Sequence, residues 1–196
     1  MIVGVTGSVG TGKSTVSRMF AENGAVRIDT DRLAHEALEK RNAPHRKVVL
    51  TFGRGILQKG GKISRPKLAR VVFQDAKALK CLNRLIHPYV IRRIKEEIRR
   101  RTRKTRKRCI VIEVPLLFEA RLRGMFDKII TVSCQKSIQE SRWVKAGRSL
   151  RALKERCASQ LPLSYKKKHS DFIIDNSGER RKTHAQVNRI WRMIVQ

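Results

Sequence analysis

Aromatic residues, acidic residues and long apolar runs are all scarce in this chain of 196 residues. No segment approaches the roughly 20 consecutive apolar residues that a membrane-spanning helix needs, and the first residues lack the charged segment and cleavage site of a secretory signal. The four cysteines, at positions 81, 109, 134 and 157, form no CxxC pair and have no histidines at zinc-binding spacing. These absences argue against a membrane span and a disulfide framework, and they predict a cytoplasmic protein with reduced thiols.

Acidic residues are strongly outnumbered, because 46 Lys and Arg face 16 Asp and Glu and give a net charge of +30. The densest basic run is RRRTRKTRKR at residues 99–108, and smaller basic groups lie at 166–168 and 180–182. Such runs either bind nucleic acid by neutralising phosphates or are solvated helix ends in a chain of general basic bias. Since no aromatic residue interrupts the long run to stack on bases, we favour the second interpretation and keep nucleic acid as a secondary candidate partner.

One motif carries the strongest chemical signal. Residues 7–14 read GSVGTGKS, which fits GxxxxGK followed by Ser or Thr, and they directly follow the apolar run at residues 1–5. We expect a short buried strand ending at Thr6, a tight turn made by glycines, and a helix whose first N–H groups point into the loop. Such a loop holds phosphate, with Lys13 at the outer phosphates and the Ser14 hydroxyl as a magnesium ligand. The motif therefore predicts a binding site for a nucleoside triphosphate.

The rest of the chain alternates between strands and helices. Apolar runs rich in β-branched residues predict four further strands, at 26–29, 110–114, 128–132 and 171–175. Helical patterns lie at 32–40, 44–52, 65–73 and 77–100, the last interrupted at Pro88. Residues 41–108 contain no convincing strand, so we expect a helical insertion there. Five short buried strands separated by helices predict one α/β domain with a parallel, doubly wound sheet.

Ligands of such sheets bind at the carboxyl ends of the strands, so polar residues directly after the strands are candidates for the site. Asp29 and Asp31 lie in the loop expected after the second strand, where one can act as a base or both can cap the next helix; we choose Asp31 because it lies further toward the site. Glu113 either holds magnesium through water, as a Walker B carboxylate does, or is an ordinary strand-end residue. His87, before Pro88, either caps a break between helices or contacts a substrate.

Residues 135–160 are basic and helical, with cations at Arg142, Lys145, Arg148, Arg151, Lys154 and Arg156. Phosphoryl transfer needs positive groups that arrive from a lid, so the segment suits that role, although solvated helix faces would carry the same residues. The chain has no NKxD guanine motif and no long domain for coupling to motion, which argues against a GTPase or a motor ATPase.

Five strings recur in one order along the chain: GVTGSVGTGKST at 4–15, DTD at 29–31, HPYV at 87–90, VPLLFE at 114–119 and DNSG at 175–178. Together they resemble the dephospho-CoA kinase family over nearly the whole chain, and the HPYV and VPLLFE strings are far more specific than a P-loop. The resemblance implies a P-loop kinase fold with a core at about 1–40, 109–134 and 170–196. It also implies a helical substrate-binding insertion at about 41–108 and a helical lid at about 135–165.

The activity that the resemblance implies is transfer of the ATP γ-phosphoryl, with Mg²⁺, to the ribose 3′-hydroxyl of dephospho-CoA, by a monomer or a small homo-oligomer. Asp31 then looks like the catalytic carboxylate and Lys13 and Arg142 like catalytic cations. The implied ligand contacts are Gly7, Gly10, Thr11, Gly12, Lys13, Ser14, Thr15 and Asn176 for the nucleotide, and His87, Leu117 and Glu119 for the substrate.

The chain departs from the family in two places. A second lid arginine usually stands a turn after the first, but residues 144–146 read Val-Lys-Ala here, and a lysine cannot reproduce a bidentate guanidinium. The basic run at 99–108 is the other departure, since a kinase of small metabolites has no evident need for it. A nucleoside or nucleotide kinase of related fold and a P-loop ATPase stimulated by nucleic acid are the alternative functions.

Overall fold

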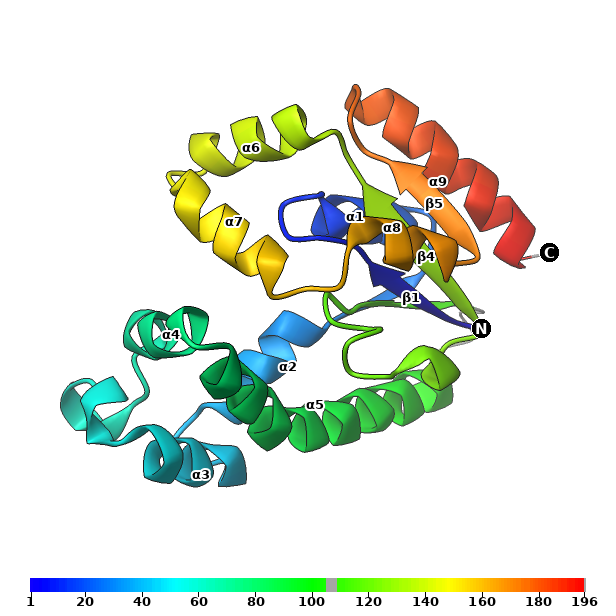
Figure 1. The fold of residues 1–196 in the computed structure, drawn as a ribbon. Coiled ribbons are helices and arrows are strands. Elements are labelled where there is room, and N and C mark those ends of the chain that lie inside the picture. The colour runs from blue at the N-terminus through cyan, green and yellow to red at the C-terminus, as the bar shows by residue number, and fades with distance from the viewer. Residues whose placement is uncertain (105–108, 196) are drawn as a thin grey trace. The chain divides into compact units, whose positions relative to one another are not determined.

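The computed structural model describes residues 1–104 and 109–195 (Figure 1). The chain folds into two compact units, of which the first comprises Met1–Asp29 and Arg101–Gln196 and the second Thr30–Arg100. The last four residues of the basic run, 105–108, lie outside the described residues, so the predicted solvated helix end is described only as far as Lys104. Within the described residues, no helix is both long enough and apolar enough to cross a bilayer.

The first unit is built on a sheet of five strands, β1 (Ile2–Thr6), β2 (Val26–Asp29), β3 (Ile110–Glu113), β4 (Lys128–Ser133) and β5 (Phe172–Asp175). Their order in the sheet is β2-β3-β1-β4-β5, and every neighbouring pair is parallel. The predicted five-stranded parallel sheet is therefore confirmed. Because all strands run in one direction, their carboxyl ends meet at one edge, where Val5 and Asp29 are both in register with Glu113.

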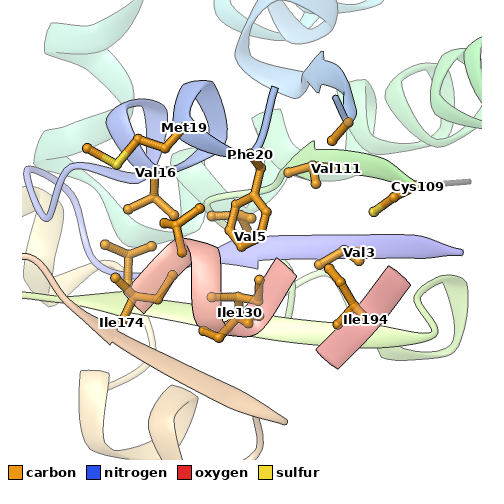
Figure 2. Packing of buried hydrophobic residues seen from close by; sticks show 14 residues of the cluster. Val3, Val5, Val16, Met19, Phe20, Cys109, Val111, Ile130, Ile174 and Ile194 are labelled. Atoms are coloured by element: carbon orange, nitrogen blue, oxygen red, sulfur yellow. The ribbon is translucent and has the colours of Figure 1, made fainter. Parts of the chain in front are cut away.

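Two helices cover one face of this sheet, α1 (Lys13–Glu22) and α9 (Arg180–Val195). Figure 2 shows how Val16, Met19 and Phe20 of α1 and Ile194 of α9 pack against the strands. The other core residues lie on the sheet face toward these helices and on the buried side of α9. Among them are Val3, Val5, Val111, Ile130, Val132, Ile174, Val187 and Ile190. Short β-branched side chains fill a surface of this kind densely, which is why these runs form the central strands.

The opposite face of β1 is closed by the segment after β3. A Cβ on Gly4 would lie only 2.7 Å from Cδ1 of Leu117 and 3.0 Å from Cγ of Phe126, so the close approach of these side chains requires glycine. Three helices belong to the segment between β4 and β5, namely α6 (Lys136–Lys145), α7 (Leu150–Ala158) and α8 (Leu163–Lys168). They occupy the stretch for which the sequence predicts a lid.

The second unit is helical, with α2 (Thr30–Ala37), α3 (Ala43–Phe52), α4 (Arg65–Gln74) and α5 (Ala76–Lys104), of which α5 continues past the end of the unit. Two short 3₁₀ turns at Arg54–Ile56 and Lys59–Gly61 connect α3 to α4. The unit has its own core of buried apolar residues, Ala37, Val48, Ile56, Ile63, Leu68, Val72, Leu82 and Ile86. Helical character without a described strand is what the sequence predicts for this region.

The predicted interruption at Pro88 is wrong, because α5 runs through it without a break. Proline removes one N–H, and the carbonyl that loses its partner is that of Arg84, four residues earlier. Both residues are exposed, so solvent can take the place of the missing donor while Leu82, Ile86 and Ile94 stay buried on the other side of the helix. His87 therefore lies inside a helix and caps no break.

The loop predicted at 29–31 is also wrong. β2 ends at Asp29 and α2 begins at Thr30, so the strand passes directly into the helix. Asp31 lies in the first turn of α2, where a negative side chain is favoured by the helix dipole, and Asp29 still belongs to the strand.

Candidate active site

The P-loop has the geometry that its glycines predict. Gly7, Gly10 and Gly12 have φ angles of 144°, 77° and 89°, which lie in the region that side chains with a Cβ rarely adopt. Space requires glycine as well, because a Cβ on Gly7 would clash with the Val132 carbonyl and one on Gly12 with the Asn176 amide. Helix α1 begins at Lys13 directly after this turn, so the loop ends at a helix N-terminus, which favours anions.

Asn176, which directly follows β5, holds the P-loop through its side-chain amide. Its Nδ2 donates to the Thr11 carbonyl at 2.9 Å, and its Oδ1 accepts from the Thr183 hydroxyl of α9 at 3.0 Å. The residue is only 5% exposed, so both ends of the amide are committed inside the protein. The Asn176 carbonyl accepts a hydrogen bond from Nη1 of Arg142 at 2.7 Å, which links α6 to the same loop.

Ser14 and Glu113 lie together at the carboxyl edge of the sheet, as the sequence predicts for a magnesium site. The Ser14 hydroxyl donates to Oε1 of Glu113 at 2.7 Å, and Nη2 of Arg27 lies 3.0 Å from Oε2 of the same carboxylate. Arg27 also pairs with Asp29 at 3.1 Å. Since Glu113 is only 3% exposed, these partners keep its charge from being buried alone.

Lys13 and the lid cations have defined places. Lys13 Nζ donates to the Ser8 carbonyl at 2.9 Å, across the P-loop from its own Cα. In the lid segment, the guanidiniums of Arg148 and Arg156 lie 4.6 and 5.8 Å from the centre of the Trp143 ring, which packs them as cation–π partners. Lys145, which stands where the second lid arginine is expected, is exposed.

The VPLLFE string folds into an anchored segment. Leu117 is fully buried against Gly4, and Glu119 Oε1 accepts from the Leu161 N–H at 2.9 Å and lies 2.8 Å from Nζ of Lys166. Lys166 Nζ also donates to the Pro115 carbonyl at 3.0 Å, and the residue is 0% exposed. The interpretation of residues 166–168 as one surface charge group is therefore wrong for Lys166, whose charge is paired in the interior.

Asp31 and His87 both lie in the second unit, where Glu36 is bound by two residues of α5. Tyr89, two residues along α5, donates to Oε1 of Glu36 at 2.7 Å, and Nε of Arg93 lies 2.9 Å from the same oxygen. The hydrogen bond from Tyr89 lowers the pKa of the Glu36 carboxyl, and Arg93 lowers it further. Desolvation lowers the pKa of the half-buried His87 imidazole, which favours its neutral form.

Three residues at the site are not among the predicted site residues: Arg27, Gln139 and Gln160. Arg27 alternates with apolar residues in Val-Arg-Ile-Asp, and a cation inside a short strand was a signal that it faces a carboxylate. Gln139 donates to the Val9 carbonyl, and Gln160 Oε1 accepts from the Val9 N–H at 3.2 Å. The stretches 139–142 and 156–160 share in the resemblance to the family, but the sequence does not show what either glutamine binds, because Val9 lies more than 120 residues away along the chain.

Comparison with known proteins identifies the family and the fold of the chain. The family model for dephospho-CoA kinase matches residues 1–182. A dephospho-CoA kinase of Aquifex aeolicus is 35% identical over 189 residues, which cover 96% of this chain and 95% of the relative. The crystal structure of a Thermus thermophilus protein aligns with a TM-score of 0.83 at 27% identity, over 100% of this chain and 98% of that one.

The structure of a dephospho-CoA kinase from Campylobacter jejuni aligns with a TM-score of 0.70 at 28% identity, over 98% of this chain and 96% of that one. The predicted family and the predicted P-loop kinase fold are both confirmed. The chain belongs to the dephospho-CoA kinase family.

Proposed function

We propose that this chain phosphorylates the ribose 3′-hydroxyl of dephospho-CoA with ATP, giving coenzyme A and ADP. The observation that carries the proposal is the pairing of Ser14 with Glu113 at 2.7 Å beside a glycine-built phosphate loop, in a chain that matches the family over residues 1–182. A hydroxyl and a buried carboxylate at that place are the pair with which P-loop enzymes hold Mg²⁺ at a nucleotide, and the family match supports dephospho-CoA as the acceptor.

The residues present fit a magnesium ion. Hydroxyl and carboxylate oxygens are the hard ligands that Mg²⁺ prefers, and Ser14 Oγ and Glu113 Oε1 already lie within 2.7 Å of each other. In the part of the chain that the structure describes, no three His, Cys, Asp or Glu side chains form a metal cage by themselves. Ser14 and Glu113 would therefore hold the ion together with phosphate oxygens and water, and the ion would neutralise phosphate charge.

The chain's own groups then take three roles. Lys13 and Arg142 bring positive charge to the migrating phosphoryl group, and the N–H groups of Gly10–Thr15 bind the phosphates. Asp31 accepts the proton of the attacking hydroxyl from the first turn of α2, which directly follows β2. The side chain, carbonyl and N–H of Asn176 are all engaged within the protein, so a contact with the adenine would come from the backbone of the residues that follow it.

On the acceptor side, we propose His87 and the VPLLFE segment as substrate contacts. The lowered pKa of His87 keeps the imidazole neutral, so it can accept or donate one hydrogen bond to a ligand. The Leu117 side chain is buried against Gly4, so its contribution would come from the backbone. Glu119 binds the Leu161 N–H and Lys166 through Oε1, whereas its buried Oε2 has no hydrogen-bond partner among the described residues and is left for a ligand. We place the reaction in the cytoplasm, in keeping with the free cysteines.

An acceptor panel tests the proposal. Purified protein with ATP and Mg²⁺ is offered dephospho-CoA, adenosine, AMP and an RNA oligomer, and ADP release is followed together with the mass of the product. We expect turnover with dephospho-CoA alone, and a loss of about 10² or more in Lys13→Ala, because the ammonium stabilises transition-state charge. Turnover of nucleosides, or ATP hydrolysis driven by RNA, would replace the proposal with one of the alternative functions.

A further inference from the structure

The outer turn of the P-loop is held by side chains from the segment between β4 and β5. Gln139 of α6 donates from Nε2 to the Val9 carbonyl, and Gln160, two residues after α7, accepts from the Val9 N–H at 3.2 Å. Cys157 Sγ lies 3.5 Å from the Ser8 hydroxyl and 3.7 Å from Gln139 Nε2. Both polar groups of the Val9 backbone are therefore satisfied by amides from opposite ends of the α6–α7 segment.

These two hydrogen bonds satisfy backbone groups that the P-loop itself leaves without partners. Every backbone N–H and carbonyl withdrawn from water needs a partner, and Val9 lies in a turn where no strand or helix supplies one. A glutamine amide offers one carbonyl oxygen and one NH₂ group, so each of the two glutamines supplies the group that one side of Val9 requires. Helix α6 also packs on the next residue, since a Cβ at Gly10 would lie 3.3 Å from Cγ of Gln139.

A second tie joins α6 to the loop two residues further on. Arg142 Nη1 binds the Asn176 carbonyl at 2.7 Å, and Asn176 Nδ2 binds the Thr11 carbonyl at 2.9 Å. The Val9 and Thr11 carbonyls are thus both held by donors outside the loop. A carbonyl that turned toward a bound phosphate would repel it, whereas the N–H groups of the loop attract it.

The peptide between Val9 and Gly10 is the one at risk of turning. Gly10 has a φ of 77°, and glycine adopts positive and negative φ about equally well, so the peptide before it can flip at little cost unless the Val9 carbonyl is held. Gln139 provides that hold, and Gln160 fixes the N–H on the other side of the same residue.

We infer that Gln139 and Gln160 are positioning residues that lock the Val9 peptide and so keep the phosphate loop in its anion-binding form. The inference rests on the proposed function in taking ATP as the ligand. It follows that ATP affinity and the attachment of the α6–α7 segment are coupled, because the same two amides serve both. Neither glutamine touches the reacting groups, so their effect is on ATP binding more than on the chemical step.

The test uses one substitution at both positions. Gln139 acts as a donor and Gln160 as an acceptor, so Glu in place of Gln keeps the required group at 160 and removes it at 139, with the same charge change at both. We expect Gln139→Glu to raise the Kd for ATP by about tenfold or more, and Gln160→Glu to raise it by at most about threefold. Equal effects or the reverse order would overturn the inference.

Apolar variants test the same two hydrogen bonds without introducing a charge. Gln139→Met and Gln160→Met keep the size of the side chain and remove the amide, and we expect both to raise the KM for ATP several-fold while kcat and the KM for dephospho-CoA change less. The control is Gln74→Met, the same substitution at an exposed position at the end of α4 in the second unit.

Direct binding separates this inference from the proposed function. The Kd is measured with ATP alone by calorimetry and by the ATP-dependent rise in melting temperature, neither of which needs an acceptor. If the wild type binds ATP but leaves dephospho-CoA unmodified, the proposed function fails while the order of the glutamine variants still decides the inference. If dephospho-CoA is turned over and the variants of Gln139 and Gln160 bind ATP like the wild type and the Gln74→Met control, the inference fails alone.

Discussion

At the scale of single residues, one guanidinium distinguishes the carboxylates near the end of β2. Arg27 Nη2 lies 3.1 Å from Asp29 and 3.0 Å from Glu113, so Asp29 is part of a paired set within the sheet. Asp31 lies in the first turn of α2 and belongs to the second unit. The two aspartates are therefore not equivalent, although they are only two residues apart.

We predict that Asp31→Asn lowers kcat by about 10² or more and changes either KM by a few-fold at most, because a base contributes chiefly while the hydroxyl attacks. Asp29→Asn is the matched control, with the same loss of charge two residues away, and it should hurt less. Steady-state kinetics with ATP and dephospho-CoA measure both. A larger loss of kcat in Asp29→Asn would assign the base to Asp29.

His87 gives a prediction about pH. Because desolvation lowers its pKa in the folded state, the unfolded chain takes up a proton that the folded chain resists once the pH falls below the ordinary value of 6.5. The free energy of unfolding should therefore fall as the pH is lowered through this range. Glu36, whose pKa is also lowered, loses its contribution only below its ordinary value of 4.5, so the two effects are separate.

Urea unfolding at pH 7.5 and pH 5.5 checks this, with His87→Asn as the comparison. The variant should lose less stability between the two pH values than the wild type does, whatever its stability at pH 7.5. An identical loss in both proteins would show that other groups cause the acid sensitivity.

At the scale of elements, the ion pair of Glu119 with Lys166 attaches α8 to the segment after β3. Removing Glu119 leaves the buried Lys166 ammonium with the Pro115 carbonyl but without its carboxylate, and we predict that Glu119→Ala lowers the free energy of unfolding by about 3 kcal/mol or more. Glu155→Ala is the control, since it breaks an exposed pair with Arg151 and should cost less than about 1 kcal/mol. Urea unfolding measures both, and similar losses would contradict the prediction.

The sequence predicts elements well where local chemistry dominates and fails where distant packing does. The strands follow from β-branched apolar runs and the P-loop from its glycines, because both depend on neighbours in sequence. Pro88 misleads, since propensity favours a break that the buried side of α5 overrides. The burial of Lys166 and the hold of two glutamines on Val9 depend on partners far along the chain, which no local pattern reports.

At the scale of the whole molecule, the protein carries a net charge of +30, whereas its substrates are all anions. Such a field attracts nucleotides from solution, and salt screens it beyond about 8 to 10 Å at physiological ionic strength. We predict that kcat/KM falls as salt rises. The basic run at 99–108 should contribute little of this, if it is a solvated helix end.

Replacing Arg101, Arg103, Lys104 and Arg106 with Gln separates these contributions, although Arg106 lies outside the described residues. We expect kcat/KM for dephospho-CoA at 0.15 M salt to stay within a few-fold of the wild type. In a salt series with RNA, the slope of log K should shrink by roughly 0.7 to 0.9 for each phosphate contact removed. RNA binding that is unchanged would show that the run contacts no nucleic acid, and a collapse of kinase activity would show that it serves substrate capture or folding.

Because Lys166 is buried, its rate of chemical labelling can report how often this part of the protein opens. An amine-reactive reagent reaches the exposed Lys168 at once, but it reaches Lys166 only when this part of the protein opens. Labelling of Lys168 thus reports the reactivity of the reagent, and labelling of Lys166 reports the opening of the protein. Both lysines lie on α8, so mass spectrometry can measure both in one peptide. The ratio of the two labelling rates would report how often the α8 region opens during turnover.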